Sequence, residues 1–434
     1  MKFSIKSSLV AFFIILSFAV VSFGVFGLTH SQEPTGDAGQ YNNYAQNLIS
    51  RGVYTMGESG FDNFREPGYP FFLFAIYKIF GLFNFVAVRL VQLILLAFVG
   101  YFIYLTFSVY GQKKFGLLAG ILSVLVPYMG YYSVELTTEL VFTFLLAFSF
   151  WLLIKIIKTE KADVFYYVAL GTVLGYSALV RTQILLFPFL FFAVYLFFTR
   201  SSRVFKNIDI KKSAIGFLFF VLLIGGWITY VYSQSGSLSI TEGRQGQLIY
   251  YRAVRTELSY KETAQYLSSW LKRSVKGGGS DSFLDKYEFK NLYDDYYQQV
   301  SNPQQAVGMR NKNIKTIIKN FDKYLLGNGI EFVKLVFVEH TYAGSYNKYL
   351  RAGFYTGLYL LFLNGIVRFV FLKQKTFRLV FWLSLFYLFY NYLIITALDA
   401  IPRYNTPYLM FYLLIGLIGI YPFLDRYFLL EKKH

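Results

Sequence analysis

Ten long apolar runs constrain this chain more than any other feature of its sequence. A membrane-spanning α-helix needs about 20 consecutive apolar residues, or fewer where it is tilted or lined by protein. The runs cover residues 8–28, 84–107, 115–132, 138–157, 164–180, 183–199, 213–232, 352–372, 378–397 and 405–424. We therefore predict an all-α polytopic membrane protein with about ten transmembrane helices.

Composition excludes the main alternatives. The chain is 56% hydrophobic and 15% charged, whereas about a quarter of the residues of a soluble domain are charged. Its 49 Phe and 39 Tyr carry more apolar area than a disordered chain leaves exposed. The chain has no cysteine, and His30, His340 and His434 are widely scattered, so neither a disulfide nor a zinc site is predicted.

The basic residues set the orientation. A formal net charge of +18 would suggest nucleic-acid binding in a soluble protein. Here the basic residues outside the long outer segments gather in alternate connections, which share one side if all ten spans exist. They are Lys2, Lys6, Lys113, Lys114, Lys155, Lys158, Lys161, Arg200, Arg203, Lys206, Lys211, Lys212, Arg368, Lys373, Lys375, Arg378, Arg426, Lys432 and Lys433. The positive-inside rule makes that side cytoplasmic, so we expect a multi-pass cell-membrane protein with both termini inside and no nucleic-acid partner.

Two long segments then lie on the outer side. Residues 29–83 form a first outer loop, and residues 233–350 form a hydrophilic region that we expect to be mainly helical. We predict three parts: a transmembrane catalytic module at 1–232, this extracytoplasmic region, and a C-terminal transmembrane module at 351–434. A flexible break is expected at Gly277-Gly278-Gly279-Ser280.

The first outer loop carries an amphipathic pattern. Tyr41, Tyr44, Ala45 and Leu48 fall at i, i+3, i+4 and i+7, which predicts a short helix at the membrane surface. Asp37 stands where that helix begins. It is either an N-cap carboxylate, which this position favours, or a functional acid.

A second motif follows at Arg65-Glu66-Pro67-Gly68-Tyr69-Pro70. Two prolines and a glycine within four residues predict a rigid turn that holds Arg65 and Glu66 near Asp37. The alternative is a structural turn with solvated charges.

Further charged residues are predicted at the outer ends of the spans. Glu135 and Glu139 are four residues apart, which predicts a shared helical face. Acids at this depth usually face a cavity or a partner, although a helix N-terminus also favours glutamate and suits Glu135 better. Arg181 and Arg403 fall at outer turns, where an isolated arginine can be an interfacial anchor. Together, acids and arginines on one face suit chemistry on a lipid phosphate.

The ordered motifs resemble those of GT-C glycosyltransferases, specifically the bacterial relatives of protein O-mannosyltransferases and of lipid A aminoarabinose transferase. The residues that carry the resemblance are Gly36-Asp37-Ala38, Arg65 to Pro70, Thr138-Glu139, Val180-Arg181-Thr182-Gln183, Gly236 to Tyr250, and Arg403-Tyr404.

This resemblance implies a transferase that uses a polyprenyl-phosphate sugar donor on the extracytoplasmic face. It implies that Asp37 is the catalytic acid–base residue, that Glu139 matches the second acidic motif and that Arg403 matches the arginine of the last outer turn. We expect a hexosyl- or pentosyltransferase that inverts the anomeric carbon.

The remaining site residues complete this expectation. Arg181 and Arg65 are candidates, with Arg403, for binding the donor phosphate, and Glu66, Tyr404 and Tyr41 are candidates for support. A divalent cation, Mg²⁺ or Mn²⁺, on Asp37 and Glu139 is compatible with the sequence and not required by it. The acceptor is a glycan, a lipid or a protein, and membrane lipids are further partners.

Two other functions remain open at this stage. A polysaccharide polymerase or ligase would also have a large outer segment and a lipid-linked substrate, but would depend on arginines more than on Asp37. A lipid or small-molecule transporter would favour broken helices, repeated halves and charges at mid-membrane. The charges here cluster at the outer ends of the spans, which favours the transferase.

Overall fold

The protein is all-helical in the part of the chain that its structure describes. The computed structural model describes residues 5–27, 33–58, 60–199, 205–276, 282–287, 289–299, 303–337, 348–371, 377–397 and 402–426. Every regular element in these ranges is an α-helix or a 3-10 helix, apart from a short π-helical turn after Leu424, as the apolar pattern predicts.

Seven helices are long and apolar enough to cross a membrane by length and composition. They are α1 (Ile5–Gly27), α4 (Phe85–Ser108), α7 (Thr138–Lys158), α10 (Ile210–Ser235), α17 (Lys348–Phe371), α18 (Arg378–Ala397) and α19 (Leu409–Leu424), the last extended by the 3-10 helix η3 (Pro402–Tyr408). These correspond to seven of the ten predicted spans.

The other three predicted spans differ from simple transmembrane helices. Residues 115–132 fall in α5 (Lys113–Val124) and α6 (Pro127–Val134), which are bent by 57° at a break before Pro127. Proline lacks the N–H that would continue the helix, and it drives the preceding residue toward extended backbone. Residues 164–180 form α8 (Val164–Val180), and 183–199 form η1 (Thr182–Ile184) and α9 (Phe187–Thr199), which are shorter. The described residues therefore support seven membrane spans, or eight if the bent pair is one span. The predicted number of ten is not confirmed.

The two segments that the sequence predicts to lie outside the membrane, called the first loop and the outer region below, are helical as well. The first loop contains α2 (Asp37–Arg51) and α3 (Gly68–Phe80), and α2 buries Tyr41, Tyr44 and Ala45, which confirms the predicted amphipathic helix. The hydrophilic region contains α11 (Glu242–Thr256), α12 (Tyr260–Lys276), α13 (Ser282–Lys286), α14 (Phe289–Gln299), α15 (Pro303–Lys319) and α16 (Phe321–Phe337). The predicted break at Gly277–Ser280 lies outside the described residues.

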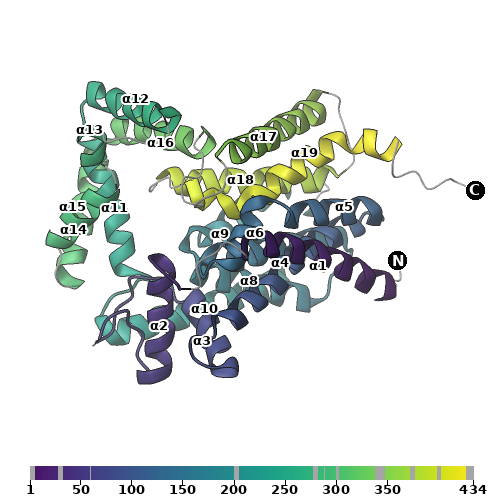
Figure 1. Cartoon of the computed structure of the whole chain (residues 1–434), viewed down its shortest axis with the longest axis horizontal. Helices are drawn as coiled ribbons and strands as arrows, with labels where there is room; N and C mark the ends of the chain where they lie inside the picture. Colours follow the sequence, from purple (N-terminus) through teal and green to yellow (C-terminus); the bar gives the residue numbers. More distant parts are fainter. Residues whose placement is uncertain are drawn as a thin grey trace, which may run out of the picture.

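The start of α1 and the end of α19 lie at the same end of the bundle, and α2 and α11 to α16 lie at the other end (Figure 1). This arrangement also gathers the first loop, the outer helices and η3 on one side of the protein.

Glycines allow some of these helices to approach closely, as is common between membrane helices. A Cβ added at Gly171 of α8 would lie 1.8 Å from the carbonyl oxygen of Gly216 in α10. A Cβ at Gly216 would lie 2.4 Å from the carbonyl oxygen of Tyr167. Neither helix can carry a side chain at this crossing without moving apart.

We predict that Gly171→Ala destabilises the protein, because the new methyl group must separate α8 from α10. Overpacking of this kind costs about 1–3 kcal/mol. The measurement is the thermal unfolding midpoint of the purified protein. Gly225→Ala in α10 is the matched control, since its Cβ would meet nothing within 4 Å. Equal midpoints for the two variants would contradict the close crossing.

Candidate active site

Asp37 is the first residue of α2 and follows Gly36, whose φ of +58° favours glycine. Gly36 occupies the N-cap position, so the N-cap interpretation of Asp37 is wrong. The Asp37 carboxylate instead accepts hydrogen bonds from two arginines, through Oδ1 from Arg65 Nη2 and through Oδ2 from Arg403 Nη2. It is therefore held between cations from two distant segments of the chain.

Arg65 reaches Asp37 from the loop between α2 and α3, as the predicted turn requires. Its Nε and Nη2 both donate to Gln40 Oε1, at 2.8 and 2.5 Å, and its guanidinium lies 5.2 Å from the centroid of the Tyr41 ring. Gln40 lies one helical turn after Asp37, so the two face Arg65 together. Burial raises the pKa of Tyr41 to about 12, so its hydroxyl keeps its proton at neutral pH.

Two residues fix the path of this loop. Asp62, which the sequence analysis missed, accepts hydrogen bonds from the backbone N–H groups of Met56 (2.6 Å) and Phe64 (3.2 Å). Burial raises the pKa of the Asp62 carboxyl. Gly68 begins α3 where a Cβ would lie 2.6 Å from the backbone nitrogen of Val180, so only glycine lets the loop pack on the end of α8.

Glu139 and Arg181 form a buried ion pair at the ends of α7 and α8. Arg181 Nη2 lies 2.5 Å from Glu139 Oε1, and the side chains are 8% and 1% exposed. Arg181 Nε also donates to Thr138 Oγ1 at 2.8 Å. Arg403 Nε lies 3.6 Å from the same Glu139 oxygen, so Glu139 joins Arg181 to Arg403.

The predicted pairing of Glu135 with Glu139 on one helical face is wrong. Glu135 follows α6 in an extended conformation, and α7 begins only at Thr138, so a spacing of four residues is not one helical turn here. The Glu135 carboxylate accepts a hydrogen bond from Tyr131 at 2.7 Å instead.

Five charged side chains thus alternate in sign, in the order Arg65, Asp37, Arg403, Glu139 and Arg181. Three guanidinium groups against two carboxylates leave one surplus positive charge within this set. The Nη1 atom of Arg181 is buried and has no hydrogen-bond partner among the described residues. A buried donor of this kind is costly unless a ligand satisfies it, and guanidinium groups match phosphate oxygens well.

The predicted supporting residues lie around this charged cluster. The Tyr404 ring centroid is 5.2 Å from the Arg181 guanidinium and 6.0 Å from that of Arg403. Glu66 accepts a hydrogen bond from Thr182 at 3.2 Å, which ties the loop to the turn after α8. The structure therefore brings together the predicted acids Asp37 and Glu139, the three predicted arginines and their predicted supporting residues, but not Glu135.

A divalent cation does not fit the two carboxylates well. The described residues contain no group of three or more His, Cys, Asp or Glu side chains that could hold a metal ion. Arg403 contacts both Asp37 and Glu139, so a cation already lies between the two acids. Mg²⁺ and Mn²⁺ favour several oxygen ligands, which this arrangement does not offer.

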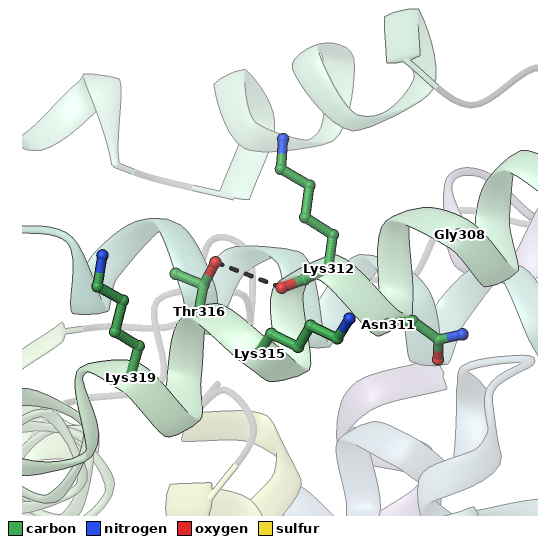
Figure 2. Close-up of a pocket in the computed structure, with 6 residues that line it drawn as sticks. All are labelled: Gly308, Asn311, Lys312, Lys315, Thr316 and Lys319. Carbon is green, nitrogen blue, oxygen red and sulfur yellow. Dashed lines mark hydrogen bonds between the residues drawn. The ribbon is translucent and has the colours of Figure 1, made fainter.

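A separate hollow of about 410 Å³ lies on the surface of α15 (Figure 2). It is lined by Gly308, Asn311, Lys312, Lys315, Thr316 and Lys319. These residues belong to one helix, and none of them is part of the charged cluster. The hollow is an open basic surface of the outer region, whereas the charged cluster is the candidate active site.

Comparison with solved structures gives distant likenesses. The crystal structure of ArnT from Cupriavidus metallidurans bound to undecaprenyl phosphate is 13% identical, with a TM-score of 0.41. The apo structure of the same protein is 14% identical, with a TM-score of 0.43. Each match covers 96% of this chain and 78% of the other. No curated protein sequence matches the chain.

A family comparison is more informative. Residues 65–228 match the family described as dolichyl-phosphate-mannose-protein mannosyltransferase. The matched segment includes Arg65, Glu139 and Arg181, three of the five residues of the charged cluster. The predicted resemblance to this mannosyltransferase family is thereby confirmed over residues 65–228 of a polytopic, all-helical chain.

Proposed function

We propose that this protein transfers a sugar from a polyprenyl-phosphate donor to an acceptor hydroxyl on the extracytoplasmic face, with inversion. Helix α2, which begins at Asp37 of the charged cluster, lies at the end of the bundle opposite the start of α1 and the end of α19 (Figure 1). The positive-inside rule assigns that end to the outer face. The family match supports a lipid-phosphate-linked sugar as donor.

One observation carries the proposal, namely that the Asp37 carboxylate is held between Arg65 and Arg403. A donor phosphate brings negative charge that competes for the same guanidinium groups. When Arg403 and Arg65 turn to the phosphate, Asp37 loses its cationic partners and can accept a proton. Donor binding would therefore activate the base at the moment when it is needed.

The reaction balances with these groups. The acceptor hydroxyl gives its proton to Asp37 while its oxygen forms a bond to the anomeric carbon. The bond from that carbon to the phosphate oxygen breaks, and the electron pair leaves with the lipid phosphate. The leaving phosphate gains one negative charge, which Arg403, Arg181 and Arg65 neutralise without a proton donor. Attack opposite the leaving group inverts the carbon.

The direct test incubates the purified protein with a panel of polyprenyl-phosphate sugars and follows release of the free lipid phosphate. The proposal requires release from at least one donor, by transfer or by slow hydrolysis. No release from any donor would favour the transporter interpretation.

The first variant is Asp37→Asn. It keeps an acceptor oxygen for an arginine but cannot take a proton, so we expect the transfer rate to fall by roughly two to four orders of magnitude. Affinity for undecaprenyl phosphate should not fall, because a carboxylate that competes for Arg403 has been removed. If affinity and rate fell together, Asp37 would be a structural residue and not the base.

The second prediction concerns Arg403. Lysine keeps the charge but loses the planar fork that binds two phosphate oxygens, so Arg403→Lys should weaken binding of undecaprenyl phosphate and Arg403→Ala should weaken it further. Arg378→Ala is the matched control, because Arg378 is an exposed arginine at the first residue of α18. If Arg403→Ala bound undecaprenyl phosphate with the parental affinity, Arg403 would be only an interfacial anchor.

We further propose that residues 233–350 select the acceptor, since this is the long hydrophilic segment on the outer side. Tyr250, Tyr251 and Tyr296 are buried in a small core of this region, so their rings are not free to stack on a sugar. Selective contacts from the described residues would come from exposed side chains such as Tyr260, which is 58% exposed.

Exchange of residues 233–350 with the segment of a relative that uses another acceptor tests this assignment. Acceptor preference should move with the segment, and donor preference should stay, because the charged cluster is unchanged. Donor hydrolysis and transfer are assayed separately. A change of donor preference would show that this division of roles is wrong.

A further inference from the structure

α16 joins the outer helices to the segment that carries Arg403. It packs on α11 on one side and on α18 and η3 on the other. The Phe332 ring of α16 lies 5.1 Å from that of Tyr392 in α18. α16 is therefore placed to transmit the position of the outer region to the active site.

Buried charges hold α16 against α11. Arg252 and Arg255 of α11 both contact Glu331 of α16, with N–O distances of 3.7 and 3.2 Å. The side chains of Arg252 and Glu331 are 2% and 1% exposed. Removing one partner from a buried ion pair is strongly destabilising, so this contact sets where α16 lies.

Arg252 also fixes one particular side chain of α16. Its guanidinium lies 4.9 Å from the centroid of the Tyr324 ring, and its Nη2 donates to the Tyr324 carbonyl oxygen at 3.3 Å. A Cβ at Gly327 would lie 3.4 Å from both Nη atoms of Arg252, which is ordinary van der Waals contact, so the guanidinium packs directly on this turn of α16. Tyr324 is thus held on both its ring and its backbone.

The Tyr324 hydroxyl donates to the carbonyl oxygen of Ala397 at 2.9 Å. Ala397 is the last residue of α18, where carbonyl groups have no partner within the helix. Arg403 follows six residues later. Asn391 of α18 donates to Asn405 of η3 at 3.1 Å, so α18 and η3 are tied together around the arginine.

We infer that Tyr324 is a positioning residue for Arg403, and that the Arg252–Glu331 contact supports it from the outer region. The hydrogen bond from Tyr324 fixes the position of the end of α18. That position in turn determines where η3 begins and how Arg403 reaches Asp37. The effect on donor binding rests on the proposed role of Arg403 in holding the phosphate.

This arrangement gives the outer helices influence over the donor. A contact that shifts α11 or α16 moves Tyr324 and hence the end of α18. Coupling of this kind is reciprocal for binding free energies, so a bound donor phosphate would in turn stabilise the packing of α16.

The test uses Tyr324→Phe in the full-length protein reconstituted in lipid nanodiscs, because this change removes only the hydroxyl. Loss of one hydrogen bond should weaken the affinity for undecaprenyl phosphate by roughly three- to tenfold. Tyr260→Phe is the matched control. Tyr260 lies in α12, and its hydroxyl donates to Asp322 of α16, the helix that also carries Tyr324. Affinity should stay at the parental value in this variant.

A double-mutant cycle separates positioning from general stability. In an Arg403→Ala background, Tyr324→Phe should cause no further loss of affinity, because the residue it positions is absent. An equal loss in both backgrounds would overturn the inference, and so would a lower melting temperature with parental affinity.

Hydrogen exchange provides a readout that does not depend on the ligand. In Tyr324→Phe, the amides of residues 403–406 and 408 should exchange faster, whereas those of α2 should be unchanged. Unchanged exchange at these amides would reject the positioning role. Parental affinity in Arg403→Ala would instead reject the phosphate role of Arg403, so the two failures are distinguishable.

Discussion

The Asp37 carboxylate, held between Arg65 and Arg403, is the interaction on which the rest of the site depends. Removing a charge from water costs several kcal/mol unless a partner compensates it. Five charged groups can share this poorly solvated region only because they alternate in sign and each contacts the next. The constraint is mutual, because the acids bring together loops and helix ends that are distant in the chain.

The same pairing explains how a lipid phosphate could enter. The resting cluster has one more guanidinium than carboxylate, and Arg181 Nη1 is a buried donor that has no partner in the described part of the chain. A phosphate can therefore bind by exchanging partners rather than by opening a preformed cavity.

Sequence reasoning located this site because each of its residues stands beside a helix end or a turn that local chemistry marks. Gly36, Pro67 and Gly68 mark the first loop, and the ends of apolar runs mark Arg181 and Arg403. It failed where backbone geometry interrupts a pattern. Glu135 and Glu139 have helical spacing, but the chain between them is extended. Contacts such as that of Tyr324 with Ala397 join segments 73 residues apart, and no local sequence pattern predicts them.

Arg403 is the member of the cluster that needs the most support from elsewhere. It meets Asp37 across 366 residues of sequence, so this contact forms only when the N-terminal and C-terminal helices have packed together. A 3-10 segment has few internal hydrogen bonds with which to hold such a side chain in place. The structure supplies anchors on both sides of it, with Tyr324 at the end of α18 and Asn391 against Asn405 in η3. A helix of the outer region thereby helps to determine where the last arginine of the charged cluster lies.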